Sequence, residues 1–382
     1  MNNRVENELL VCCARTEASP EAAARVRELA ASKELDWEYL IKLARRHAVV
    51  PLLYLQLARE GPDLIPPSDL SKLKLQYQEN SARNTILTAE LCNLIKLFSD
   101  NGIDAIPYKG PALALFAYDN LALRRFVDLD VIVKKSDVPR ARDLLLAEGY
   151  TLTKSLTTAQ QDLLLRTQHN LQFARDNRRL LLELHWEVAP HLFASSVQEN
   201  ELWQNLITID VNGTKMKTLS ADDLLFSLCV HGSRHLWERM GWICDVAELI
   251  HRHDLNWPAL LRRASDADSE RMFLLGLHLA QKLLQAELPA EVRERCAADD
   301  RLESLATNVV EHLFNGPTHV PATSSEIFKY NIGVRKTLSA RARYLLYIFR
   351  PTDSDLESRS LPPSLSFAYY LTRPFRLFRT KI

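Results

Sequence analysis

Acidic side chains in two short apolar segments are the residues of this sequence best suited to chemistry. Asp128 and Asp130 open one apolar run, and Glu183 is the only acid inside the run 180–186. Alternate side chains of a strand point to the same face, so Asp128 and Asp130 should lie side by side. Two carboxylates so close raise each other's pKa unless a cation lies between them. Such oxygen ligands bind Mg²⁺ when substrate phosphates complete its coordination shell.

Glu183 needs a partner, because a run as apolar as 180–186 is normally buried on both faces. A metal ion is one possible partner, and a buried arginine is the other. His185 lies two residues further on and therefore shares the strand face of Glu183. Three roles remain open for His185: a hydrogen bond to a metal-binding acid, a contact with a phosphate, or a satisfied place in the core.

These segments together resemble a known protein family. The similarity is to the poorly characterised bacterial branch of the nucleotidyltransferases in the DNA polymerase β-like superfamily, and it covers roughly residues 35–375. The motifs that carry it are Tyr108-Lys109-Gly110, Arg124, Asp128-Leu129-Asp130, Glu183-Leu184-His185-Trp186, His231-Gly232-Ser233-Arg234-His235 and Trp242-Ile243-Cys244-Asp245.

The resemblance implies a role for each matching position. Gly110 is then the glycine of the turn that holds a nucleoside triphosphate, and two Mg²⁺ ions are bound by Asp128, Asp130 and Glu183. The sequence departs from the wider superfamily in three ways. Pro111 stands where a turn serine is usual, the distance from Gly110 to Asp128 is longer, and the third acid is glutamate instead of aspartate.

Further side chains are expected to bind the nucleotide, namely Lys109, Arg124 and His185. The ammonium group of Lys109 could bind the β- or γ-phosphate in place of the missing serine hydroxyl. The alternative is a surface lysine beside a turn. Arg124 lies four positions before Asp128, so it either clamps the triphosphate or pairs with that carboxylate.

The helical part of the chain is expected to offer four polar side chains to the cleft: His231, Arg234, His235 and Asp245. The two histidines are four positions apart on one helix face, a spacing that can bind zinc. However, Gly232 replaces the glutamate of the H-E-x-x-H motif, and no third ligand is evident. Asp245 is the only acid among its neighbours, so it should have a partner, with Arg239 or Arg234 as the candidates.

The composition is that of a globular protein with one large or two ordinary domains. The chain has 382 residues, of which 47% are hydrophobic and 25% charged. Its formal net charge of +0 provides no overall field that attracts nucleic acid. We therefore expect a small-molecule or protein acceptor and no extended nucleic-acid track.

The expected location is the cytoplasm. The six cysteines show no metal-binding spacing and are typical of reduced thiols in apolar helices. The N-terminus lacks the apolar core of a signal peptide. No run approaches the ~20 apolar residues of a membrane span, so no transmembrane segment is expected.

The elements that must position these residues predict an α+β fold. It consists of a small mixed-sheet nucleotidyltransferase core flanked by N-terminal and C-terminal helical regions. The periodicity predicts strands at 103–108, 130–133, 150–153, 169–174 and 180–188, with a helix over 138–148. The expected divisions are a helical region over 1–100, the α/β core over 101–218, a helical domain over 219–316 and a basic segment over 317–382 docked on the body.

The sequence therefore predicts a Mg²⁺-dependent nucleotidyltransferase. It should move a nucleoside monophosphate from a nucleoside triphosphate to an acceptor by attack on the α-phosphate, with release of pyrophosphate. Two alternatives remain. One is a module of the same fold that binds a nucleotide or a partner without catalysis, which the missing turn serine favours. The other is a toxin-like enzyme that modifies tRNA or protein.

Overall fold

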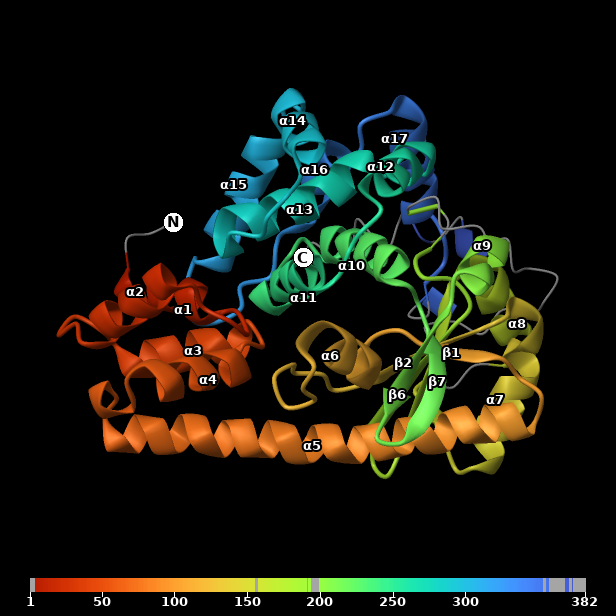
Figure 1. The fold of residues 1–382 in the computed structure, drawn as a ribbon. Coiled ribbons are helices and arrows are strands. Elements are labelled where there is room, and N and C mark those ends of the chain that lie inside the picture. The colour runs from red at the N-terminus through yellow and green to blue at the C-terminus, as the bar shows by residue number, and fades with distance from the viewer. Residues whose placement is uncertain are drawn as a thin grey trace.

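A small mixed sheet lies between helices from both ends of the chain (Figure 1). The computed structural model describes residues 4–154, 157–190, 192–193, 199–352, 355–356, 368–370 and 373. The expected α+β class with helical flanks is confirmed. The divisions into regions remain a proposal.

The N-terminal helices rest on one long helix. Their bounds are α1 Val5–Cys13, α2 Pro20–Ala30, α3 Trp37–Arg46, α4 Val50–Glu60 and α5 Pro67–Asp100, with a 3-10 turn at Pro62–Leu64. Asp36 caps α3 by accepting a hydrogen bond from the Tyr39 amide. The single helix α5 has 34 residues and runs beneath both the helical bundle and the sheet (Figure 1).

The main sheet has five strands in the order β1-β2-β5-β4-β3. The strands are β1 Ala105–Pro107, β2 Leu129–Val133, β3 Thr151–Leu152, β4 Asn170–Arg175 and β5 Leu180–His185. The pair β2–β5 is parallel and every other pair in this sheet is antiparallel. The helices of this part are α6 Gly110–Tyr118, α7 Val138–Ala147 and α8 Thr158–Thr167.

The expected strands are all present, but most are shorter than the apolar runs that predicted them. A turn at Asp176 and Asn177 connects β4 to β5, and both residues have positive φ. Helix α8 was not predicted, although Thr157 and Gln160 form a capping box, which is a sequence signal for the N-terminus of a helix. A separate hairpin of β6 Ile207–Val211 and β7 Thr214–Thr218 follows helix α9 Glu199–Gln204.

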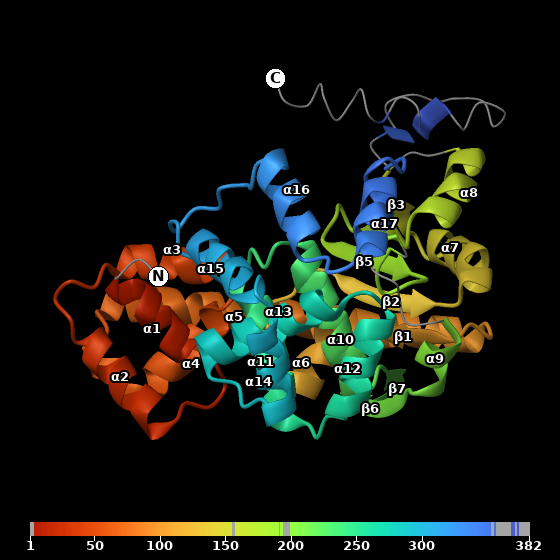
Figure 2. The same cartoon turned by 90° about the horizontal axis from the view of Figure 1, so that it is seen from above.

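The remaining helices follow the hairpin, and several of them pack against one another. They are α10 Ala221–Arg234, α11 Met240–Arg252, α12 Trp257–Asp266, α13 Glu270–Leu284, α14 Ala290–Ala298, α15 Leu302–Leu313, α16 Ser324–Gly333 and α17 Leu338–Ile348. Seen from above, α1 and α4 lie beside α11 and α13 (Figure 2). One hydrophobic cluster joins Leu9 and Leu53 from the N-terminal helices to Ile243 and Leu275 from this group.

The basic segment 317–382 lies partly outside the described residues. Within its described part, Arg335 is fully buried and donates a hydrogen bond of 2.9 Å to the Phe193 carbonyl. Tyr344 of α17 joins the large hydrophobic cluster. Among the residues that the structure describes, no helix combines the length and apolar character needed to cross a membrane.

Candidate functional site

The parallel strands β2 and β5 bring the three candidate acids together. The strand register places Asp130 directly opposite Glu183, and Asp128 lies two residues before Asp130 at the start of β2. All three side chains line one cleft of about 970 Å³. Residues 53 positions apart in the chain, Asp130 and Glu183, therefore face the same space, as the sequence predicts.

Two cationic or potentially cationic side chains contact Asp130. The Lys109 ammonium lies 3.3 Å from Asp130 Oδ1, and His185 Nε2 lies 3.1 Å from the same oxygen. His185 Nε2 is also 3.2 Å from Glu183 Oε2. His185 is buried beneath the acids, so of its three possible roles the hydrogen bond to an acid is the one seen.

Strand β4 supports Glu183 from the other side. Asn170 Nδ2 donates to Glu183 Oε2 at 2.9 Å, and Gln172 Nε2 donates to Oε1 at 2.8 Å. These two residues alternate with Leu171 and Phe173, which point into the core. The polar face of β4 thus fixes the orientation of the Glu183 carboxylate, and no arginine pairs with it among the described residues.

The electrostatic environment differs sharply among the acids. Burial favours protonation of Asp130, but Lys109 and His185 outweigh it and hold the pKa of Asp130 well below its usual range. Burial and repulsion from Asp130 and Glu183 raise the pKa of Asp128 to about 6. Within the described part of the chain, Asp128 forms no hydrogen bond or ion pair. Asp128 is therefore the acid that lacks a cation.

The donor set fits a divalent cation. One ligand atom from each of Asp130, Glu183 and His185 lies within 4.8 Å of the others. The predicted ligands were Asp128, Asp130 and Glu183, so this group contains His185 in place of Asp128. Asp128 adds a carboxylate at the cleft beside it. Carboxylate oxygens are the ligands that Mg²⁺ prefers, so the acids Asp128, Asp130 and Glu183 are suited to it.

The Lys109-Gly110 turn joins β1 to α6 next to these acids. Gly110 has a left-handed φ of +52°, and a Cβ atom there would lie 3.4 Å from the Asp128 carbonyl oxygen. Only 12% of the Lys109 side chain is exposed, and Lys109 lines the cleft. This position excludes the surface-lysine alternative. The ammonium also lies 4.9 Å from the centre of the Tyr108 ring.

Arg124 pairs with Asp245 and not with Asp128. Arg124 Nε lies 2.8 Å from Asp245 Oδ1, and its Nη2 lies 3.0 Å from Oδ2. The Tyr118 hydroxyl donates a third hydrogen bond of 2.7 Å to Asp245. The expectation that Arg239 or Arg234 pairs with Asp245 is wrong. Arg124 still lines the cleft, whereas Asp245 lies behind it.

His231 and His235 line the cleft from α10 and its C-terminal end, together with Trp242 of α11. The three ring centres lie 4.7 to 5.4 Å apart. Burial, aided by nearby cations, lowers the pKa of His231 and brings that of His235 to about 3, so both rings are neutral at pH 7. No third metal ligand joins them among the described residues.

Arg234 and Gly232, which lie between these histidines in the sequence, do not contribute side chains to the cleft. Arg234 does not line the cleft, because its Nη1 lies 2.8 Å from His169 Nε2 beside the sheet. Gly232 is fixed by packing, since a Cβ there would lie 2.4 Å from the buried Trp237 ring. The absence of glutamate at position 232 thus has a steric cause.

Further residues line the cleft although the sequence does not predict them there. They come from the end of α3, the loop before β2, the start of α11 and the loop before α16: Lys42, Arg45, Arg46, Ala48, Arg125, Phe126, Val127, Glu238, Arg239, Trp242, Pro317, Thr318 and His319. From the sequence, Arg125 is interpreted as a solvated neighbour of Arg124, and the structure places it in the cleft lining. Trp242 belongs to a motif that carries the family resemblance, and Arg239 is predicted from the sequence only as a possible partner of Asp245. The other residues are brought in by packing between distant helices and carry no local signal.

The chain matches a model of a protein family. A family model described as an uncharacterised nucleotidyltransferase matches residues 33–285. The matched range includes the Lys109-Gly110 turn, the three acids and the ring cluster of His231, His235 and Trp242. No curated protein matches the chain.

Proposed function

The chain belongs to an uncharacterised family of nucleotidyltransferases, and from this premise we propose that it moves a nucleoside monophosphate from a nucleoside triphosphate to an acceptor. The observation that carries this proposal is the register of β2 and β5. That register sets Asp130 opposite Glu183, with Asp128 beside them in an open cleft.

The proposed reaction is an in-line displacement at the α-phosphorus. A nucleophilic atom of the acceptor forms a bond to that phosphorus while the bond to the bridging oxygen breaks. Pyrophosphate leaves with the electron pair of the broken bond, and the acceptor releases its proton to solvent. Such a displacement needs positioning and charge stabilisation and asks for little covalent chemistry from the protein.

Asp128, Asp130 and Glu183 are the residues that would hold Mg²⁺, with two ions proposed. Bound Mg²⁺ neutralises charge on the triphosphate and activates the attacking group. The protein's own residues do the positioning. His185, Asn170 and Gln172 hold the carboxylates in place.

The remaining groups are proposed to bind the substrate. Lys109 and Gly110 contact the phosphates from the turn. Arg124 contributes positive charge from the cleft wall, where Asp245 fixes its position. The neutral rings of His231, His235 and Trp242 offer a surface on which the nucleoside or the acceptor can pack.

The proposed compartment is the cytoplasm, and the proposed acceptor is a small molecule or a protein. All six cysteines are free thiols, which supports a reducing environment.

Transfer of label from each α-³²P nucleoside triphosphate to a component of cell lysate, with Mg²⁺ present, tests this function. The wild-type chain should label one acceptor class, and Asp130→Asn should reduce labelling at least about 100-fold, because removal of one group aimed at developing charge commonly has that effect. Asp143→Asn is the matched control, since Asp143 is 65% exposed on α7. Equal labelling by wild type and Asp130→Asn would reject the proposal.

A second candidate is a module that binds the nucleotide without turnover. The contacts of Lys109 and His185 with Asp130 favour it, because these groups already compensate the charge that a metal ion would compensate. Saturable binding of a nucleoside triphosphate by the wild type, with no pyrophosphate release at any Mg²⁺ concentration, would select this candidate.

A further inference from the structure

Four arginines at the edge of the cleft form a group that we call the arginine rim. Arg45 lies in the last turn of α3, Arg83 in α5, Arg125 before β2, and Arg239 at the N-cap of α11. All four are exposed. Arg45 and Arg125 line the main cleft and also a neighbouring cavity of about 180 Å³, which Arg83 lines too. Arg239 lines the main cleft.

The arginine rim lacks carboxylate partners. Within the described residues, none of its four members forms an ion pair with an acid, whereas Lys109, Arg124 and Lys42 of the same cleft each do. Two acids that line these cavities, Glu238 and Glu79, form no ion pair with a rim arginine within the described residues. Glu238 lies 4.0 Å from His319, and Glu79 lines the smaller cavity without an ion pair to Arg83.

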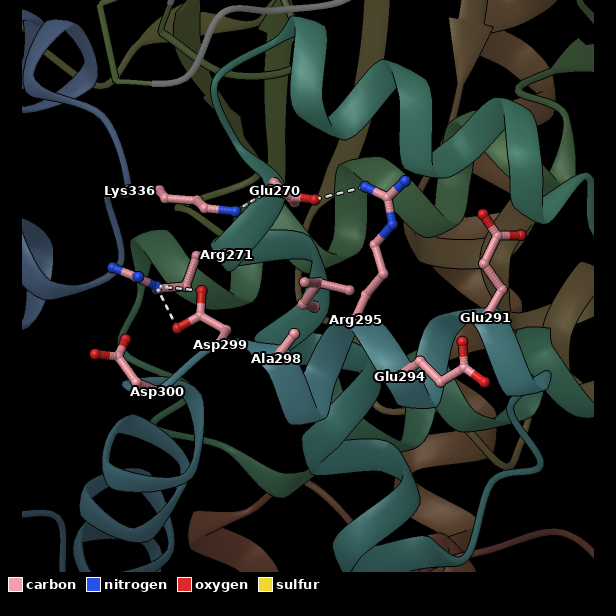
Figure 3. Close-up of a pocket in the computed structure, with 10 residues that line it drawn as sticks. Glu270, Arg271, Glu291, Glu294, Arg295, Ala298, Asp299, Asp300 and Lys336 are labelled. Carbon is pink, nitrogen blue, oxygen red and sulfur yellow. Dashed lines mark hydrogen bonds and ion pairs between the residues drawn. The ribbon is translucent and has the colours of Figure 1, made fainter.

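Basic side chains in another pocket of the molecule pair with acids of the same pocket. The pocket between α13 and α14 shows this clearly (Figure 3). There Glu270 pairs with Arg295 at 2.8 Å and with Lys336 at 2.9 Å, and Arg271 pairs with Asp299 at 2.8 Å. All three basic side chains of that pocket are therefore paired with acids, whereas the four arginines of the rim are not.

The members of the rim lie close enough to repel one another. Burial lowers the pKa of the Arg125 guanidinium, and the charges of Arg83, Arg239 and Arg45 lower it further. Arg125 Nη1 also donates a hydrogen bond to the Arg45 carbonyl at 3.4 Å, which keeps the two residues adjacent. Like charges held together in this way are stabilised when an anion lies between them.

We propose that the arginine rim binds phosphate groups of the acceptor, so that the acceptor is a phosphate-bearing molecule. The inference rests on the proposed function, in which the triphosphate lies at Lys109 and Gly110. Those residues belong to the turn between β1 and α6, whereas the rim comes from α3, α5, α11 and the loop before β2. Guanidinium groups match phosphate with paired hydrogen bonds, which an ammonium group cannot do.

The test measures binding of two phosphate-bearing probes to the full chain in the presence of a chelator. The probes are inorganic phosphate and a 5′-phosphorylated single-stranded hexanucleotide. The double variant Arg83→Ala/Arg125→Ala should weaken the binding of at least one probe tenfold or more. For the oligonucleotide, loss of two contacts should reduce the salt slope of log K by about 1.4. The control Arg262→Ala removes an exposed arginine of α12 that lines neither cavity, and it should stay within twofold.

The two probes distinguish the source of the phosphate. Rim-dependent binding of the oligonucleotide indicates a nucleic-acid end as the acceptor, and rim-dependent binding of inorganic phosphate alone indicates a small phosphorylated compound. Either result supports the inference. If neither probe depends on the rim, or if the double variant weakens binding of Mg²⁺–ATP tenfold instead, the inference is overturned.

Two measurements keep this test separate from that of the proposed function. Arg83 forms no hydrogen bond or ion pair among the described residues, so Arg83→Ala alone preserves the fold and repeats the test if the double variant is unstable. Binding in chelator does not require turnover. Rim-dependent binding without any nucleotide transfer would refute the proposed function alone, and transfer without rim-dependent binding would refute the inference alone.

Discussion

At the scale of single residues, the Arg124–Asp245 pair shows how a buried ion pair supports the cleft wall. Both side chains are almost wholly buried, with 11% and 2% exposed. The pair ties the loop before β2 to α11, and the Tyr118 hydroxyl adds a bond from α6. Removal of one partner leaves a buried charge uncompensated, which is more costly than removal of both.

We therefore expect Asp245→Asn to lower the free energy of unfolding by about 3 kcal/mol. The double variant Arg124→Met/Asp245→Asn should recover at least about 1 kcal/mol of that loss, because it also removes the buried guanidinium that has lost its carboxylate partner. Urea unfolding of both variants measures this. Asp100→Asn, which breaks the exposed i,i+4 pair with Lys96, should change stability by less than about 0.5 kcal/mol. A double variant less stable than the single one would contradict the account.

At the scale of elements, the site depends on a parallel strand pair and a glycine turn. Strands β2 and β5 are neighbours although β3 and β4 intervene in the chain, so the acids meet through the pairing of two strands that are distant in the sequence. Gly110 then brings the start of α6 against the Asp128 carbonyl. Its left-handed φ is a conformation that side chains with a Cβ rarely adopt.

Two glycines allow this turn to be tested with a matched control. Gly110 and Gly102 have φ values of +52° and +66°, but a Cβ at Gly102 would have no heavy atom within 4 Å. Both Gly110→Ala and Gly102→Ala should therefore cost about 1–2 kcal/mol of stability from the backbone conformation. Only Gly110→Ala should also lower the rate of nucleotide transfer. Thermal unfolding and transfer assays of the two variants compare these effects, and equal activity losses would argue against a role for the turn.

The sequence predicts local elements and single-strand faces well, because these depend on alternation and turn residues. The strands predicted at 130–133, 169–174 and 180–188 and the shared face of Glu183 and His185 follow from such patterns. Partners across distant segments are not encoded in this way. The pairing of Arg124 with Asp245, 121 positions away, and the approach of Arg45 to the cleft arise from helix packing. The sequence alone could therefore name the acids but not the arginine rim.

At the scale of the whole molecule, the N-terminal and C-terminal helices share one core and His47 lies at their junction. His47 is fully buried after α3. Its Nε2 lies 3.0 Å from the Leu313 carbonyl at the end of α15, and its Nδ1 accepts from the Met240 amide at the start of α11. A neutral ring satisfies both contacts, whereas a protonated ring would present a donor to the Met240 N–H group.

This arrangement predicts a loss of stability in acid. Burial, aided by Arg46, lowers the pKa of His47 from 6.5 to about 3. The unfolded chain takes up a proton as the pH falls below about 6.5, and the folded chain does not, so stability present above that pH is lost between about 6.5 and 3. Between pH 7.5 and 5, the wild type should lose about 2 kcal/mol relative to His47→Gln, which has no titrating ring there.

Urea unfolding of the wild type and His47→Gln at both pH values measures this difference. Because the other histidines are present in both proteins, their titration cancels to first order. A stability gap that stays constant between pH 7.5 and 5 would show that His47 is not held neutral by the junction.

The most direct test of the central claim is pyrophosphate release from nucleoside triphosphates by the wild type and by Asp128→Asn, measured against Mg²⁺ concentration. Asp128 has no hydrogen bond or ion pair within the described residues, so its carboxamide should leave the fold intact. The account predicts Mg²⁺-dependent release by the wild type and at least about a 100-fold lower rate for Asp128→Asn at equal stability. Equal rates for the two proteins, or wild-type release that is unchanged by chelation of Mg²⁺, would contradict it.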